Sequence, residues 1–358
     1  MTESILFQEL SLGPLTLKNR VVMAPMTRCR ATADHVPTEL MARYYAQRAS
    51  AGLLITEGTS PSPNGLGYAR IPGCFSDAQV QGWRKVTDAV HAEGSRMFLQ
   101  LMHTGRVSHP LNLPEGARVL APSAVRLSGE MWTDQEQAQP YPEPEAMTLE
   151  EVRATVEEFV ASARAAVEAG FDGVEIHGAN GYLIDQFLNP CTNRRTDEYG
   201  GSAKNRQRFA LEVATKVVAA IGKERVGIRL SPFGVFNDME AYEGLEDETV
   251  DLARQLSELG LVYFHLVDHA DQGAPALPTT LKPRLREAFS GRFLLSGGYD
   301  RARAEADLGE NKGDLVVFGR PFVSNPDLVS KLREEAELTA PDFATFYTPG
   351  EKGYTDYA

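Results

Sequence analysis

The stretch that decides the fold spans residues 148–182, TLEEVRATVEEFVASARAAVEAGFDGVEIHGANGY, in which a helix pattern, a glycine and an apolar run follow one another. Thr148 and Glu151 have the spacing of a capping box, so we expect a helix to begin there, and Gly170 is its expected end. The apolar run Gly173–Ile176 predicts a strand with little solvent-facing alternation, as in parallel strands covered on both faces. This stretch therefore has the helix-to-strand half of a βαβ unit.

The same order of helix, glycine and strand recurs along the chain, from Ser202 to Gly222 and from Asp247 to Gly260. The strand candidates are mostly near-continuous apolar runs: Val21–Pro25, Leu53–Thr59, Arg96–His103, Gly173–Gly178, Val226–Pro232, Tyr263–Asp268, Phe293–Gly298 and Leu315–Arg320. Eight such strands with crossover helices predict an α/β fold, a single (β/α)8 TIM barrel over residues 1–358. A doubly wound open sheet is the alternative. No G-x-G-x-x-G opens a helix after the first strand, which weakens its dinucleotide-binding form.

Two segments lie outside this alternation. Residues 129–148 follow the third strand, are rich in Pro, Gln and Glu, and contain Trp132 and Tyr141. We expect a hairpin or loop excursion there, which in a barrel lies over the carboxyl ends of the strands and can act as a lid. Residues Leu12–Lys18 are expected to form a short hairpin that closes the opposite end of the barrel.

The composition excludes several classes of partner. There are 49 acidic and 36 basic residues, giving a net charge of −13, and this field repels phosphate backbones, so we expect no nucleic-acid partner. Cys29, Cys74 and Cys191 are far apart and suggest neither a disulfide framework nor a metal site. No apolar run approaches the roughly 18–20 residues of a membrane span, and the N-terminus lacks a basic signal region. We therefore expect a cytoplasmic protein, as a monomer or a homodimer.

Barrel enzymes take their reactive groups from the carboxyl ends of the strands. The last two strands end in Ser296-Gly297-Gly298 and in Gly319-Arg320. Glycines let backbone N–H groups approach a ligand closely, loops after these two strands are the usual phosphate site of such barrels, and Arg320 could add a bidentate contact. The alternative is a tight turn followed by a surface cation.

Arg229 stands inside the apolar strand Val226–Leu230. A buried charge must be paired or must face a ligand. Either Arg229 forms an internal ion pair, with Glu57 or Glu175 as the partner, or it contacts a bound cofactor. The sequence leaves both interpretations open.

Three polar side chains follow the strand at Gly173–Gly178. His177 and Asn180 are three residues apart and would share one face if the strand ran into a helical turn. Both can donate an N–H to one oxygen and stabilise negative charge that develops there. Tyr182 has a phenol, whose ordinary pKa near 10 keeps it protonated at neutral pH, so it is a candidate proton donor. The alternatives are a core histidine bonded to backbone and a packing tyrosine.

The polar string continues with Asn189-Pro190, Asn193–Ser202, Asn205-Arg206 and Arg208-Phe209. From His177 to Phe209 it resembles the Old Yellow Enzyme family of flavin-dependent ene reductases. The pieces Pro25-Met26-Thr27 and His103-Thr104-Gly105-Arg106 are similar to the same family, and the resemblance reaches from Leu6 to Tyr357.

The resemblance implies that FMN binds at the barrel mouth. Thr27 would donate to the C4=O and N5 region of the flavin, as in the group of the family that has threonine rather than cysteine there. Gln100 would bond the pyrimidine side, and Arg229 would stabilise the anionic reduced ring. The residues expected to bind the cofactor are Ala24, Pro25, Met26, Thr27, Gly58, Gln100, Arg229, Ser296, Gly297, Gly298, Gly319 and Arg320.

The resemblance also implies an activity. NADPH or NADH would reduce the flavin, and an alkene activated by a carbonyl, nitro or imide group would then accept the hydride. His177 and Asn180 would bind the activating oxygen of the alkene, and Tyr182 would donate the proton. Tyr68 and Tyr347 would line the substrate pocket, and Met102 stands where many relatives have tryptophan, which leaves the substrate range open.

Other functions stay open beside this one. One alternative is a flavin-binding barrel that reduces mainly quinones or nitro and nitrate-ester compounds, and another is a non-catalytic flavin-binding partner protein. A flavin-free lyase or aldolase of the Schiff-base type needs a lysine within a strand, and none of the eight strand candidates contains one.

Overall fold

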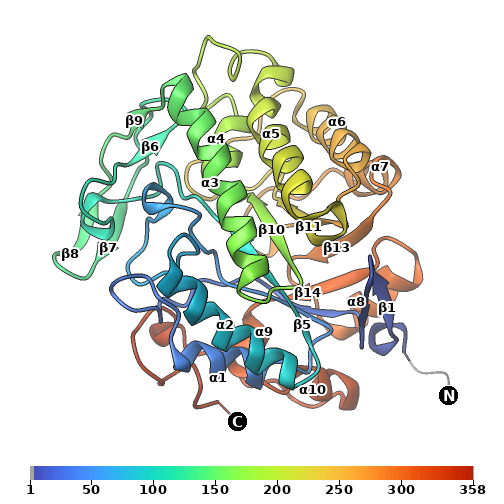
Figure 1. The fold of residues 1–358 in the computed structure, drawn as a ribbon. Helices are drawn as coiled ribbons and strands as arrows, with labels where there is room; N and C mark the ends of the chain where they lie inside the picture. Colours follow the sequence, from blue (N-terminus) through green and yellow to red (C-terminus); the bar gives the residue numbers. More distant parts are fainter. Residues whose placement is uncertain (1–3, 358) are drawn as a thin grey trace.

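The computed structural model describes residues 4–357; Met1–Glu3, part of the acidic N-terminus, and Ala358 lie outside it. Eight parallel strands close into a barrel (Figure 1). They are β3 (Val21–Met23), β4 (Leu53–Ile55), β5 (Arg96–Leu101), β10 (Gly173–Gly178), β11 (Val226–Leu230), β12 (Tyr263–Val267), β13 (Arg292–Ser296) and β14 (Leu315–Phe318). Because β14 pairs with β3, the sheet has no open edge. The predicted TIM barrel is confirmed, and the open sheet is wrong.

Helices surround this barrel. They are α1 (Glu39–Gln47), α2 (Asp77–Ala92), α3 (Leu149–Glu168), α4 (Leu183–Leu188), α5 (Ala203–Ile221), α6 (Leu245–Glu258), α7 (Leu281–Ala288), α8 (Arg301–Gly309), α9 (Arg320–Ser324) and α10 (Leu328–Glu334). The capping box of α3 is formed by Thr148 and Glu151 as the sequence predicts. Helix α6 begins at Leu245, two residues earlier than expected, after Gly244 in the left-handed region.

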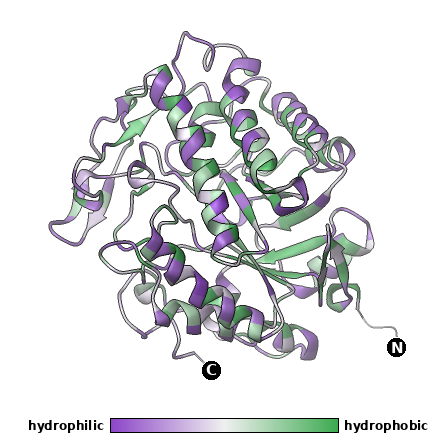
Figure 2. Ribbon diagram, viewed as in Figure 1, coloured by the Kyte–Doolittle hydropathy of each residue, from purple (hydrophilic) through white to green (hydrophobic). Residues whose placement is uncertain are grey.

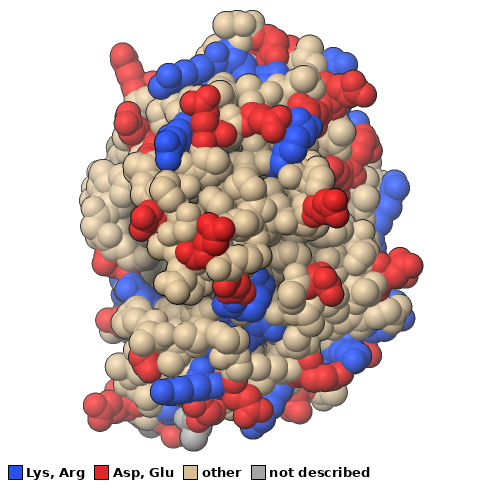
Figure 3. Space-filling view, turned by 90° about the vertical axis from the view of Figure 1, so that its left-hand side faces the viewer, with Lys and Arg blue, Asp and Glu red and all other residues tan. Residues whose placement is uncertain are grey.

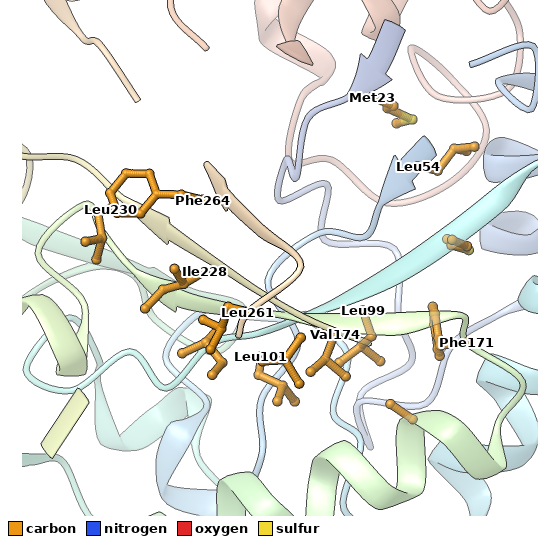
Figure 4. Packing of buried hydrophobic residues seen from close by; sticks show 14 of the residues in the cluster. Met23, Leu54, Leu99, Leu101, Phe171, Val174, Ile228, Leu230, Leu261 and Phe264 are labelled. Atoms are coloured by element: carbon orange, nitrogen blue, oxygen red, sulfur yellow. The ribbon is translucent and has the colours of Figure 1, made fainter. Parts of the chain in front are cut away.

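The core has two layers. The outer layer lies between the strands and the helices, and in Figure 4 Leu99, Leu101 and Val174 point from their strands toward a neighbouring helix. Figure 2 shows the corresponding pattern, with apolar strands and helices that are polar on one side. The inner layer fills the barrel and includes Leu12 and Leu17. These two come from the hairpin of β1 (Leu10–Leu12) and β2 (Leu15–Leu17), which the sequence predicts.

The excursion after β5 contains two small sheets. Strands β7 (Glu130–Thr133) and β8 (Gln137–Pro140) form an antiparallel hairpin, and β6 (Leu120–Ala121) pairs with β9 (Glu145–Ala146). Figure 1 shows this excursion projecting to the left of the barrel. Within residues 4–357, no helix is both long and apolar enough to cross a membrane.

Candidate active site

A cavity of about 1550 Å³ opens at the carboxyl ends of the barrel strands. This volume exceeds the roughly 300–1,000 Å³ of ordinary ligand pockets, so it has room for a large cofactor and a second molecule. The structure brings every residue that the sequence suggests for cofactor or substrate to its lining. Figure 3 shows the face on the side of the β7–β8 hairpin, where Lys and Arg side chains are seen at the centre, with Asp and Glu beside them.

His177 lies at the end of β10 and is almost fully buried. Its Nδ1 accepts the N–H of Ala179 at 3.3 Å, so its Nε2 carries the hydrogen of the neutral ring. Burial, together with the charge of Arg229, holds the pKa of His177 well below its usual range. His177 is therefore a neutral N–H donor at the cavity. Its ring packs edge-on against Tyr182, with the ring centroids 4.9 Å apart.

Asn180 also lines this cavity, but its backbone conformation is not helical. The condition of a helical turn at His177 and Asn180 is not met, because helix α4 begins only at Leu183 and Asn180 adopts the left-handed conformation, with φ of 60°. Asparagine tolerates that region better than most residues. Its N–H donates to the Ser231 Oγ at 2.8 Å, and its carbonyl accepts from the Asn237 Nδ2 at 2.7 Å.

Tyr182 precedes α4 and is bonded to a second phenol. Its hydroxyl lies 2.9 Å from that of Tyr68, and burial raises the pKa of Tyr182 to about 12. Met102 packs beside both tyrosines. Gly58 makes room for it, since a Cβ at Gly58 would lie 2.3 Å from the Met102 sulfur. Met102 therefore belongs to the part of the cavity wall beside Tyr68 and Tyr182.

A buried polar network lies beside these groups inside the barrel. Glu175, which is fully buried, accepts hydrogen bonds from the Gln100 Nε2 at 2.8 Å, the His265 Nδ1 at 2.8 Å and the Tyr263 hydroxyl at 3.1 Å. Burial alone would raise the pKa of Glu175, but His265, Arg229 and Gln100 together hold that pKa below its ordinary value. The network thus keeps one negative charge inside the barrel.

Arg229 borders the cavity on β11, between His177 on β10 and His265 on β12. The field of Glu175 acts on it, but no ion-pair contact joins the two side chains within residues 4–357. Its buried Nε has no hydrogen-bond partner in that part of the chain. A cation with an unsatisfied N–H at a cavity requires an electron-rich ligand, which the pyrimidine edge of FMN would supply.

The loops after β13 and β14, where the sequence predicts a phosphate site, border the cavity. Gly297 has φ of 127°, and a Cβ there would lie 2.0 Å from the Asp268 carbonyl oxygen, so glycine is required. The Arg303 Nη1 donates to the Gly297 carbonyl at 2.8 Å and holds the loop. The Arg320 side chain is 46% exposed and pairs with Asp271 at 2.5 Å. Arg320 therefore already has a carboxylate partner at the mouth of the cavity.

The sequence reasoning missed two parts of the cavity. His269 follows β12 and lines the cavity, although the rule that drew attention to His177, a histidine at the end of a barrel strand, applies to it as well. The segment 338–349, of which the sequence suggested only Tyr347, forms much of another wall. Arg28 and Arg30 hold it by donating to the carbonyls of Phe346 and Thr345, contacts more than 300 residues apart that no local pattern indicates.

The fold and this site define a TIM-barrel oxidoreductase with a flavin-sized cavity. The model of the NADH:flavin oxidoreductase / NADH oxidase family matches residues 5–339, and the chain belongs to this family. A relative from Leishmania infantum, named "Probable flavin mononucleotide-dependent alkene reductase", is 44% identical over 99% of this chain and 97% of its own. The chain is thus an FMN-dependent enzyme with a nicotinamide reductant.

Two solved structures have the same fold. An Old Yellow Enzyme homologue from Zymomonas mobilis is 43% identical, with a TM-score of 0.95 over 99% of each chain. Morphinone reductase in complex with tetrahydroNAD is 46% identical, with a TM-score of 0.93 over 99% of this chain and 97% of that one. The resemblance to the Old Yellow Enzyme family is therefore confirmed.

Proposed function

We propose that this enzyme uses NADPH or NADH to reduce the C=C bond of alkenes that carry a carbonyl, nitro or imide group. One observation carries the proposal: two neutral N–H donors, on His177 and Asn180, and the Tyr182 phenol border one cavity beside the Arg229 cation. The first relative's name, an alkene reductase that depends on flavin mononucleotide, supports the same chemistry.

The residues around the cavity fit the parts of FMN. Arg229 and Gln100 would contact the pyrimidine edge, Thr27 the opposite edge, and the loops at Ser296–Gly298 and Gly319–Arg320 the phosphate. Ala24, Pro25, Met26 and Gly58 complete the lining beside them. When bound, FMN accepts hydride from the nicotinamide and passes it to the substrate.

His177 and Asn180 would bind the activating oxygen of the alkene and stabilise the negative charge that grows on it. Tyr182 would give its proton to the α-carbon. Tyr68 and Tyr347 would contact the body of the substrate, and residues 129–148 would serve as a lid, since Met131, Trp132 and Tyr141 line the cavity. The side chain of Tyr347 lies at the rim, because Tyr347 is 60% exposed.

Reduction of quinones or of nitro compounds is the second candidate, because the same two donors can bind any acceptor oxygen. The two candidates differ at Tyr182, since only reduction of a C=C bond needs a proton on carbon. The membership in an oxidoreductase family argues against a non-catalytic flavin-binding protein.

Substitution His177→Phe is expected to weaken binding of a phenol, an enolate mimic, about 10- to 100-fold. The phenylalanine keeps a ring against Tyr182 but removes one hydrogen bond to a charged oxygen, which contributes about 1.5–3 kcal/mol. The measurement is a titration of the FMN-loaded enzyme with the phenol, followed by its long-wavelength absorbance. The control is His91→Phe, the same change at a half-exposed histidine that pairs with Asp172 outside the cavity. Equal phenol affinity in His177→Phe and the unaltered enzyme would contradict the proposed oxygen-binding pair.

A further inference from the structure

We propose that His269 is a positioning residue that fixes the side-chain amide of Asn180 so that its NH2 group, and not its oxygen, faces the substrate. The inference rests on the proposed function, because it concerns the oxygen that Asn180 would bind. It assigns a role to a side chain that acts through another residue, by its contact with the Asn180 Oδ1.

The contact that carries the inference joins two loops of the barrel mouth. The His269 Nε2 lies 2.8 Å from the Asn180 Oδ1. Asn180 is further held at its backbone by Ser231 and Asn237, and the Arg106 guanidinium in turn donates to the Asn237 carbonyl at 2.8 Å. The backbone of Asn180 is therefore fixed, and the orientation of its side-chain amide remains to be set.

The direction of the hydrogen bonds decides that rotation. The Gln272 Nε2 lies 3.3 Å from the His269 Nδ1, and an Nδ1 that accepts leaves the hydrogen of a neutral imidazole on Nε2. His269 then donates to the Asn180 Oδ1, so the amide oxygen is occupied. The two hydrogens of the Asn180 Nδ2 form no hydrogen bond within residues 4–357 and are left for a ligand.

The neutral state of His269 is consistent with its surroundings. Burial and the charge of Arg229 together lower the pKa of His269 to about 4, although Asp271 and Asp268 act in the opposite direction. A neutral donor fixes the amide without adding a positive charge next to the cavity. With the opposite direction of hydrogen bonds, Asn180 would present its oxygen to the substrate oxygen, which is repulsive.

A purely structural role for His269 must be distinguished from this one. Its ring packs edge-on against Phe236, with the centroids 4.6 Å apart, and Phe236 belongs to the loop that holds Asn180. Substitution His269→Phe keeps a ring at this contact and removes the donor. We expect it to weaken phenol binding about three- to tenfold, the range of one neutral hydrogen bond, and to raise KM for an enone more than it lowers kcat.

The decisive experiment is a double-mutant cycle on the FMN-loaded enzyme, with phenol dissociation constants measured for the unaltered protein, His269→Phe, Asn180→Ala and the double variant. If His269 acts through Asn180, adding His269→Phe to Asn180→Ala has no further effect on phenol binding. If the two effects multiply instead, His269 acts through packing and the inference is wrong. His269→Gln, which retains a donor, is expected to restore at least half of the lost binding free energy; a Gln variant as weak as the Phe variant also counts against the inference.

The outcomes separate this inference from the proposed function. If Asn180→Ala leaves phenol binding unchanged, the proposed oxygen-binding pair fails and His269 has nothing to position. If Asn180→Ala weakens the binding but His269→Phe does not, the pair stands and the role of His269 alone is rejected.

Discussion

Substitution Tyr182→Phe is expected to slow the reduction of an enone about 10²- to 10⁴-fold, the range that a positioned general acid contributes, while flavin reduction by NADPH keeps its rate. The hydroxyl is the only part removed, and the ring remains against His177, with 4.9 Å between the centroids. Both half-reactions can be followed separately by stopped-flow absorbance of the flavin. Equal loss in both half-reactions, or no loss in either, would contradict a role for Tyr182 as proton donor.

The pH dependence gives an independent test of the same residue. Burial raises the pKa of Tyr182 to about 12, so the protonated, donating form is present throughout neutral and mildly alkaline pH. We expect the enone half-reaction to be flat between about pH 6 and pH 10 and to fall only as pH approaches 12. Substitution Tyr68→Phe is the matched comparison, because it removes the hydrogen bond to Tyr182 and keeps the transferable proton; its effect should be much smaller.

The substrate that accepts the hydride distinguishes alkene reduction from quinone reduction, the two candidate functions. Quinone oxygens take protons readily from water, whereas the α-carbon of an enone needs a positioned donor. Tyr182→Phe should therefore spare quinone reduction. If quinone reduction slows as much as enone reduction, the variant has damaged the cavity and not the proton transfer.

The barrel could be predicted from the sequence because its strands are continuous apolar runs, and such runs occur where both faces of a parallel strand are covered. The predicted strands extended too far at several carboxyl ends, as in Leu53–Thr59 against the observed Leu53–Ile55. The residues that follow the paired part of each strand are buried by loops and not by strand pairing. Hydropathy is similar for both kinds of buried residue, so it does not show where the strand ends. The closure of the barrel nevertheless brings the strand ends together, and for that reason the predicted site residues share one cavity.

What the sequence could not indicate are contacts between distant segments and local departures from regular structure. Glu175 and His265 are 90 residues apart and meet only because β10 and β12 flank β11. The left-handed backbone of Asn180 replaces a helical turn that the i, i+3 spacing suggests. The contact of His269 with Asn180 follows from both features, which explains why a pattern search finds His177 and passes over His269.

The buried carboxylate of Glu175 gives the prediction with the largest effect on stability. Substitution Glu175→Gln is expected to lower the free energy of unfolding by about 3–5 kcal/mol, because it removes the carboxylate whose charge acts on Arg229 and leaves a buried cation uncompensated. With an unfolding entropy of about 2.1 cal/mol/K per residue, this corresponds to roughly 4–7 °C in Tm. The measurement is thermal unfolding at pH 8 in saturating FMN, with the FMN dissociation constant determined separately so that cofactor loss can be subtracted.

Glu57 provides the matched control. It is as buried as Glu175, but its pKa is raised whereas the pKa of Glu175 is lowered. Burial raises the pKa of Glu57 to about 7, so the folded protein holds its proton more tightly than the unfolded chain, and stability falls as pH rises from the ordinary carboxyl range through 7. At pH 8 the charged Glu57 is unfavourable, and Glu57→Gln should leave Tm unchanged or raise it. The pKa of Glu175 is lowered instead. The ionised Glu175 therefore stabilises the folded protein at neutral pH, and this stabilisation is lost as the pH falls through the lowered pKa. If Glu175→Gln leaves Tm unchanged at pH 8, the buried Arg229 does not depend on the charge of Glu175 and the prediction is wrong.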